Sequence, residues 1–225
     1  MAIKAVIWDF GGVLTTSPFV AFNRYEAERG IPRHFIRSVN ASNPDNNAWA
    51  RFERSEIDPA TFDVLFAEES EARGHRIPGS DVLALLAGDV RPKMVAALHA
   101  CKARYKVGCI TNNVKAIDVT ASRSITPLFG AGMAATPEKA AAVTAIMDHF
   151  DHVIESSKIE IRKPDPRIYA LMCEALDVPP HACIYLDDLG VNLKPARAMG
   201  MSTIKVENEA QALRELAALT GLDVE

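Results

Sequence analysis

Residues 3–13 read IKAVIWDFGGV, an apolar run that ends in a single carboxylate, Asp9, before two glycines. A short run of this kind is typical of a buried β-strand, and the glycines indicate a tight turn directly after it. Similar runs recur along the chain, separated by helical patterns. Strands that alternate with helices predict an α/β fold with a doubly wound parallel sheet and right-handed crossovers. We expect the strands at residues 3–9, 106–111, 152–156, 182–187 and 202–206.

The stretch from residue 17 to residue 88 interrupts this alternation, because it shows helical patterns and no convincing strand. Proline and glycine pieces divide it into short helices. A helical insertion directly after the first strand would lie over the strand ends as a lid. We therefore expect an α/β core from residues 1–16 and 89–225 and a helical cap from residues 17–88. The expected helices are 19–29, 48–54 and 60–73 in the cap and 92–104, 138–150, 166–176, 193–199 and 210–220 in the core, whereas residues 111–137 show little pattern.

The chain of 225 residues has a formal net charge of −4 and no basic run, so nucleic acid is not an expected partner. No apolar run approaches the ~20 residues of a membrane helix, and the first residues lack the apolar core of a signal peptide. The four cysteines stand singly in apolar segments, without the close spacing of a zinc site. We therefore expect buried, reduced thiols in a cytoplasmic protein.

Polar and charged residues stand where the expected core strands end. The carboxyl ends of parallel strands meet at one edge of a sheet, which is where ligands gather in such folds. The sequence therefore predicts that these side chains form one shared site. They are Asp9, the run Thr111-Asn112-Asn113, Lys163, the pair Asp187-Asp188, and Asn192 four residues later.

Each of these residues has an ordinary explanation when it is taken alone. Asp9 could begin a turn, and the Asp187-Asp188 pair could cap the helix that follows Gly190. Thr111 and Asn112 could be turn residues, and a lysine before a proline is most often a solvated surface residue. Their coincidence at successive strand ends favours the shared site.

The residue types point to phosphate chemistry. Asp9 and one of the paired aspartates can hold Mg²⁺ through carboxylate oxygens. The Thr111 hydroxyl and neighbouring backbone N–H groups can donate to phosphoryl oxygens, and Lys163 can orient the nucleophile and neutralise charge. Asp9 then attacks the phosphorus and forms an aspartyl-phosphate that water hydrolyses. Gly11 and Gly12 allow the backbone to approach metal and substrate closely.

Three segments carry a resemblance to a known family: IES at 154–156, KPDPRIY at 163–169, and YLDDLGVNLKPARAMGM at 185–201. With the first motif and the Thr111-Asn112 pair, they resemble the haloacid dehalogenase-like hydrolases, in particular the N-terminal phosphatase domain of soluble epoxide hydrolases. The resemblance implies a Rossmann-like core with a C1-type cap and a small organic phosphate as substrate. It implies that Asp9 is the nucleophile and a metal ligand, with the Gly11 carbonyl and Asp188 as further ligands and with Asp187 and Asn192 in support. It also implies that Thr111, Asn112 and Gly12 bind phosphate and that Lys163 is the catalytic lysine.

The chain departs from this pattern at Gly11, where most phosphatases of the family carry an aspartate that protonates the leaving alcohol. Loss of such a general acid commonly costs ~10²–10⁴ in rate. Three readings remain open. First, the substrate can have a leaving group that needs little protonation, as in an acyl, aryl or anomeric phosphate. Second, a bound water or a lid residue such as His34, Glu53 or His75 can supply the proton. Third, the protein can bind phosphorylated ligands with little turnover. We expect a slow or selective Mg²⁺-dependent phosphatase.

Two other functions fit part of the pattern. A 2-haloacid dehalogenase does not need the missing acid, because halide leaves unprotonated, but the Asp187-Asp188 pair then has no obvious role. In a binding module that has lost catalysis, we would expect the nucleophile or the metal ligands to be replaced. Asp9, Lys163 and Asp188 are all present. Only a few residues follow the last expected helix, so we do not expect a second catalytic domain or epoxide hydrolysis.

Overall fold

The computed structural model describes residues 2–86, 88–113 and 137–223, without the side chains of residues 137–139. The centre of the fold is a five-stranded sheet in the order β3-β2-β1-β4-β5, in which every neighbouring pair is parallel. The predicted doubly wound sheet is therefore confirmed, and all five expected strands are present. They are β1 (Ala5–Trp8), β2 (Lys106–Thr111), β3 (His152–Glu155), β4 (Cys183–Asp187) and β5 (Ser202–Lys205).

Strand β1 lies in the middle of the sheet and is buried along its whole length. The chain moves from β1 to β2 and β3 on one side and then returns to β4 and β5 on the other. The direction of strand order reverses between β1 and β4, and ligands of such sheets bind at the carboxyl ends of the strands near this reversal. Asp9 and Asp187 stand at these two carboxyl ends.

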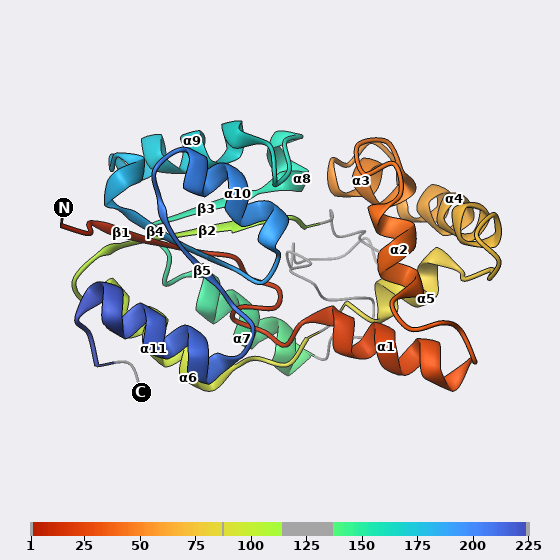
Figure 1. The fold of residues 1–225 in the computed structure, drawn as a ribbon, viewed down its shortest axis with the longest axis horizontal. Helices are drawn as coiled ribbons and strands as arrows, with labels where there is room; N and C mark the ends of the chain where they lie inside the picture. Colours follow the sequence, from red (N-terminus) through yellow and green to blue (C-terminus); the bar gives the residue numbers. More distant parts are fainter. Residues whose placement is uncertain (1, 87, 114–136, 224–225) are drawn as a thin grey trace.

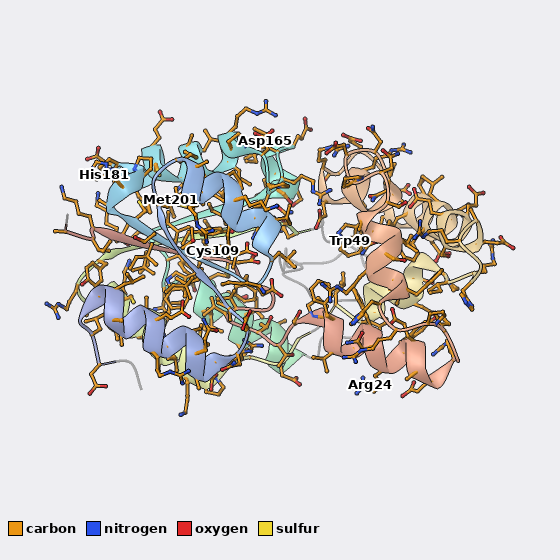
Figure 2. All side chains as sticks on the ribbon, in the orientation of Figure 1. Arg24, Trp49, Cys109, Asp165, His181 and Met201 are labelled. Carbon is orange, nitrogen blue, oxygen red and sulfur yellow. The ribbon has the colours of Figure 1, made fainter. Side chains whose placement is uncertain are left out.

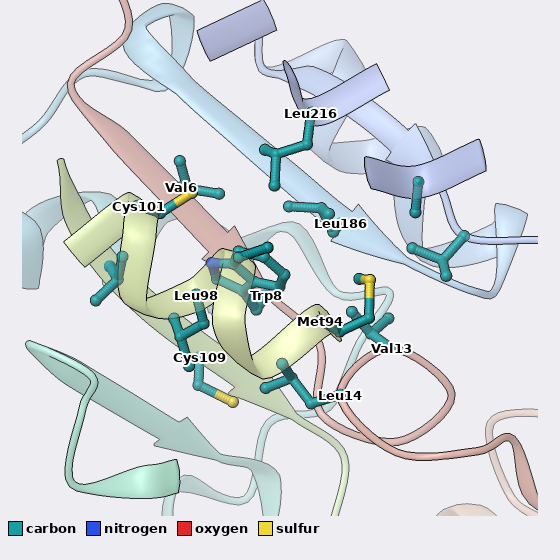
Figure 3. Close-up of a cluster of buried hydrophobic side chains, with 14 of the residues drawn as sticks. Val6, Trp8, Val13, Leu14, Met94, Leu98, Cys101, Cys109, Leu186 and Leu216 are labelled. Atoms are coloured by element: carbon teal, nitrogen blue, oxygen red, sulfur yellow. The ribbon is translucent and has the colours of Figure 1, made fainter. Parts of the chain in front are cut away.

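Helices cover both faces of the sheet (Figure 1). Side chains alternate along β1, so Val6 and Trp8 face one helical layer and Ala5 and Ile7 face the other. Figure 3 shows Trp8 between the sheet and the helix that carries Leu98. The first face packs against α6 (Pro92–Lys102), α7 (Pro137–Met147) and α11 (Glu209–Thr220), and the second against α9 (Pro166–Leu176) and α10 (Gly190–Ala198).

Local sequence explains where several core helices begin. The Asp165 side chain caps α9 by accepting a hydrogen bond from the N–H of Arg167, and Pro166 fits the first helical position. Asn208 and Gln211 form a capping box at the start of α11. Helix α10 begins at Gly190, earlier than the expected residue 193, because Asp187 fixes the N–H of Leu189 before it. The short helix α8 (Ser156–Ile159) and a 3₁₀ turn (Pro180–Ala182) were not expected.

The helical insertion lies beyond the carboxyl ends of the strands (Figure 1). It has an apolar cluster of its own, centred on Phe22, Phe52, Phe62 and Phe66. Trp49, labelled in Figure 2, lies in the insertion, and its ring packs edge-on against Phe62. Two of its helices were not predicted, α2 and α5. Its elements are α1 (Pro18–Glu28), α2 (Phe35–Ala41), α3 (Ala48–Glu53), α4 (Pro59–Glu71) and α5 (Gly79–Ala84).

The two chain segments that join the insertion to the sheet run side by side. Thr15 and Val90 form an antiparallel bridge, and the N–H of Thr16 donates to the carbonyl of Asp89 at 2.8 Å. In the part of the chain that the structure describes, no helix is both long and apolar enough to cross a membrane. All four cysteines are free and buried, as the sequence predicted. Most of the unassigned segment 111–137 lies outside the described residues.

Candidate active site

Asp9 and Lys163 form the centre of the candidate site. Asp9 directly follows β1, and the Nζ atom of Lys163 lies 2.7 Å from its Oδ1 atom and 2.9 Å from Oδ2 of Asp187. Lys163 is only 1% exposed, so it is not the solvated surface lysine that its position before a proline would suggest. The backbone N–H of Phe10 also donates to Oδ1 of Asp9, at 2.7 Å.

Asn112 holds the loop that carries Lys163. Its Nδ2 atom donates to the carbonyl of Lys163 at 3.1 Å, and its Oδ1 atom accepts from the Lys163 N–H at 2.8 Å. These two hydrogen bonds fix the lysine backbone against the end of β2. The Asn112 side chain is therefore occupied in positioning Lys163, so a phosphate-binding role for Asn112 rests on its backbone.

Asp187 is enclosed by donors. Its Oδ2 atom accepts hydrogen bonds from Lys163 Nζ, from the Tyr185 hydroxyl and from Asn192 Nδ2, and its Oδ1 atom accepts from the Leu189 N–H and again from Asn192. A carboxylate has about four acceptor positions, and these contacts use them. Asp187 is thus suited to support Lys163 and Asn192 and has little capacity left for a metal ion.

Asp188 is held from two sides. The Ser17 hydroxyl donates to its Oδ2 atom at 3.1 Å, and the same oxygen lies against the backbone of Gly12. A Cβ atom at Gly12 would lie 2.3 Å from that oxygen, and the φ angle of +78° also favours glycine there. Burial and the neighbouring charge of Asp187 raise the pKa of Asp188 to about 6, although Lys163 and Ser17 lower it.

The charge balance of the site fits a divalent cation. Carboxylate oxygens of Asp9, Asp187 and Asp188 lie within 4.8 Å of one another, and Lys163 is the ammonium that contacts two of them. Burial raises the pKa of Asp9 well above its ordinary value, Lys163 lowers it, and Asp187 and Asp188 raise it further. Burial alone would lower the pKa of Lys163, but the Asp187 and Asp9 carboxylates raise it. A hard cation with oxygen ligands would relieve this excess of negative charge.

Gly11 and Thr111 complete the set of predicted residues. Thr111 is the last residue of β2 and is buried at the same sheet edge as Asp9. Among the residues that the structure describes, a Cβ atom at Gly11 would meet nothing within 4 Å, and the φ angle of Gly11 lies outside the positive range that only glycine tolerates well. The backbone at position 11 therefore does not require glycine, and the described residues leave room there for a side chain.

The three lid residues considered as proton donors have different surroundings. His34 is exposed at the start of α2, and His75 packs its ring against Phe35, 5.0 Å between centroids. Glu53 is buried at the boundary with the core, where Arg162 Nε lies 2.8 Å from its Oε2 atom. Burial raises the pKa of Glu53, and Arg162 lowers it.

Three contributors to the site were not assigned roles from the sequence. Asn113 donates through Nδ2 to Glu155 and accepts from the backbone and the hydroxyl of Ser157, which ties β2 to the segment before Lys163. Tyr185 donates to Asp187, and Ser17 donates to Asp188. Asn113 stands next to two predicted residues, and Tyr185 two positions before Asp187, but Ser17 gave no signal in the sequence.

Two curated relatives are similar over almost all of this chain. Bifunctional epoxide hydrolase 2 of Sus scrofa is 32% identical over 100% of the chain but only 40% of its own length. The chain thus spans less than half of that relative. Phosphatase MT3486 of Mycobacterium tuberculosis is 28% identical and is matched over 97% of this chain and 96% of its own. The predicted likeness to soluble epoxide hydrolases is confirmed.

Solved structures share the fold at low sequence identity. A HAD family enzyme of Bacteroides thetaiotaomicron, in complex with magnesium and inorganic phosphate, has a TM-score of 0.54 at 18% identity, with 92% of this chain and 97% of that chain covered. The L-2-haloacid dehalogenase of Xanthobacter autotrophicus has a TM-score of 0.56 at 21% identity, covering 99% and 85%. The family model of the haloacid dehalogenase-like hydrolases matches residues 3–200. The chain therefore belongs to the haloacid dehalogenase-like hydrolases.

Proposed function

We propose that the protein is a Mg²⁺-dependent phosphatase that acts on a small organic phosphate through an aspartyl-phosphate at Asp9, in the cytoplasm. The observation that carries this proposal is the position of Asp9, 2.7 Å from the buried ammonium of Lys163 and close to the carboxylates of Asp187 and Asp188. A relative named as a phosphatase, similar over 97% of this chain, supports it. The four free cysteines agree with a reducing compartment.

Asp9 is the proposed nucleophile. Lys163 and the N–H of Phe10 both contact its Oδ1 atom, so we assign the attack on phosphorus to Oδ2. Lys163 lowers the pKa of Asp9 against the effect of burial, which favours the ionised carboxylate, and neutralises charge that develops on the phosphoryl group. The P–O bond to the leaving group breaks as the bond from Asp9 to phosphorus forms. Water then hydrolyses the aspartyl-phosphate, which releases inorganic phosphate and restores Asp9.

Asp9, Asp188 and the carbonyl of Gly11 are the proposed ligands of Mg²⁺, with Asp187 and Asn192 in support. When bound, Mg²⁺ supplies positive charge that offsets the repulsion between an anionic nucleophile and an anionic phosphate. The saturated hydrogen bonding of Asp187 supports its assignment to the supporting set. Thr111 and the backbone at Asn112 and Gly12 are the proposed phosphoryl-oxygen donors.

Residues 17–88 are the proposed C1-type cap, with residues 1–16 and 89–225 as the core. The separate apolar cluster of the insertion supports this division, as does the Thr15–Val90 bridge at its base. Because no side chain stands at position 11 to protonate an alcohol, the favoured substrates are those with good leaving groups, such as acyl, aryl or anomeric phosphates.

Carbon–halogen hydrolysis is the alternative enzyme function, and the lack of an acid at Gly11 is consistent with it because halide leaves without a proton. Against it stands the excess of carboxylates at the site, because a substrate with a single carboxylate would add further repulsion to Asp9, Asp187 and Asp188. A phosphate-binding module without turnover is the remaining alternative.

One assay separates these functions. The protein is incubated with an aryl phosphate and, separately, with a 2-haloacid, each in the presence of Mg²⁺ or of EDTA. Phosphate release that disappears with EDTA is the result we expect. Halide release that is indifferent to EDTA would replace the proposal with a dehalogenase, and phosphate binding without release would indicate the binding module.

A further inference from the structure

Ser17 occupies the N-cap position of α1 but does not cap it. Its backbone is extended (φ −68°, ψ 136°), and its side chain makes no cap hydrogen bond; instead the N–H of Val20 donates to the Ser17 carbonyl. A serine at this position usually accepts a hydrogen bond from the second or third helical N–H, worth about 1 kcal/mol. The Ser17 hydroxyl is therefore used elsewhere.

The hydroxyl donates to Asp188, which lies 171 positions away in the sequence. The Ser17 Oγ to Asp188 Oδ2 distance is 3.1 Å. The same oxygen rests on Gly12, where a Cβ atom would come within 2.3 Å. Asp188 is thus confined between the backbone of Gly12 on the core side and the hydroxyl of Ser17, the residue at which the insertion begins.

Ser17 lies just beyond the point where the two connecting segments are tied together. Thr16 donates through its N–H to the Asp89 carbonyl at 2.8 Å and accepts at Oγ1 from the Asp89 N–H at 2.9 Å. These hydrogen bonds join the two connecting segments to each other, and Ser17 lies on the insertion side of them. A displacement of the insertion relative to the sheet would therefore move Ser17 relative to Asp188.

We propose that Ser17 is a positioning residue that couples docking of the helical insertion to the metal-binding orientation of Asp188. This inference rests on the proposed function, because it takes Asp188 to be a metal ligand. With the insertion docked, Ser17 restrains the carboxylate and raises the affinity for Mg²⁺. Because coupling between two equilibria is reciprocal, bound Mg²⁺ in turn favours the docked insertion.

The test measures Mg²⁺ affinity by calorimetry in the absence of substrate. Ser17→Ala is expected to weaken Mg²⁺ binding about 10-fold, the scale of other supporting residues around metal ligands. Ser17→Thr keeps the hydroxyl and is expected to bind Mg²⁺ as the wild type does. Ser55→Ala is the matched control, because Ser55 Oγ also joins the insertion to the core, through the Ser157 carbonyl at 3.2 Å, without touching a carboxylate.

Each result decides the proposal. Equal or tighter Mg²⁺ binding by Ser17→Ala would overturn it, and so would an equal loss in Ser17→Ala and Ser55→Ala. A wild type that binds Mg²⁺ but releases no phosphate overturns the proposed function alone, since the affinity ratio still decides the role of Ser17. A wild type that does not bind Mg²⁺ overturns both.

Discussion

The carboxylate of Asp9 has an ammonium on one side, at Lys163, and the carboxylates of Asp187 and Asp188 nearby. We predict that Asp9→Asn abolishes phosphate release, because an amide is neither a nucleophile nor a good ligand for Mg²⁺. The protein should stay folded, since burial of the ionised carboxylate carries a cost that the amide avoids. Phosphate release and thermal unfolding of the same preparation measure both effects. Turnover near that of the wild type would contradict the assignment of the nucleophile.

Gly11 offers room for the acid that the family usually carries there. We predict that Gly11→Asp raises the rate on plain alkyl phosphates, by up to ~10²-fold, because protonation of a poor leaving group limits that reaction. Aryl phosphates should gain much less, since their leaving groups need little protonation. The ratio of kcat/KM values for an alkyl and an aryl phosphate is the measurement.

The neighbouring glycine provides the control. A Cβ atom at Gly12 would strike Asp188 on a left-handed backbone, whereas one at Gly11 would contact none of the described residues. Gly12→Ala should therefore lose activity and Gly11→Ala should keep it. If Gly11→Asp folds but leaves the alkyl rate unchanged, another group already supplies the proton.

Elements of the insertion and of the core meet at α3 and the loop before α9. Arg162 in this loop lies 2.8 Å from Glu53 at the end of α3 and donates to the Pro44 carbonyl. The Ser156 hydroxyl donates to the Glu53 carbonyl, which adds a second connection at the same place. These contacts fix the docked position of the insertion beside the loop that carries Lys163.

We predict that Arg162→Leu lowers the free energy of unfolding by about 2 kcal/mol near neutral pH, because the buried Glu53 carboxylate loses its ion-pair partner. The loss should be smaller in the double variant Glu53→Gln/Arg162→Leu, which removes that charge as well. Urea unfolding of the two single variants and the double variant gives the coupling between the residues. If the losses of unfolding free energy in the two single variants add up to the loss in the double variant, Glu53 and Arg162 do not stabilise each other.

The strands and most helices could be predicted because their patterns are local: apolar runs for buried strands and proline or aspartate at helix starts. Helix α2 could not be predicted in this way, because a side chain in the preceding helix fixes its first turn. The buried carboxylate of Glu26 accepts hydrogen bonds from the N–H groups of His34 and Ile36. Helix α5 begins after Pro78 with a glycine, a weak helix former.

The same distinction holds for the candidate site. The gathering of Asp9, Asp187 and Asp188 followed from the rule that strand ends meet, whereas Lys163 comes from the loop before α9. The roles of all four residues remain predictions. The contact between Ser17 and Asp188 joins distant segments whose partner no local pattern specifies. The use of the Asn112 side chain to hold the Lys163 backbone likewise depends on how the loop folds back.

For the whole molecule, the raised pKa of Asp188 links the stability of the fold to pH. Burial and Asp187 raise the pKa of Asp188 from 3.8 to about 6 in the metal-free protein. Because this pKa is higher in the folded than in the unfolded state, the folded protein binds the proton more tightly. The resulting stability is present below about pH 4 and is lost as the pH rises through about 6.

We predict that Asp188→Asn, compared with the wild type without metal, gains about 2 kcal/mol of unfolding free energy between about pH 4 and about pH 7. The asparagine does not titrate, so it avoids the cost of ionising a buried acid. Mg²⁺ at neutral pH should stabilise the wild type and have little effect on the variant. Urea unfolding at the two pH values, with and without Mg²⁺, provides the comparison. A difference between the proteins that is independent of pH would contradict the role given to Asp188.

The insertion has a hydrophobic core that is separate from those of the sheet, with Phe22, Phe52, Phe62 and Phe66 at its centre. This separation has a consequence for how the protein can evolve. Mutations in this cluster can change the shape of the insertion while the packing on both faces of the sheet stays the same. Recombination could also replace the insertion by another helical domain, provided that the two ends of the new domain lie as close together as Thr16 and Asp89 do. If the insertion is the cap, as proposed, substrate selectivity and catalytic chemistry would then evolve independently. A new substrate selectivity could arise while the residues at the strand ends stay the same.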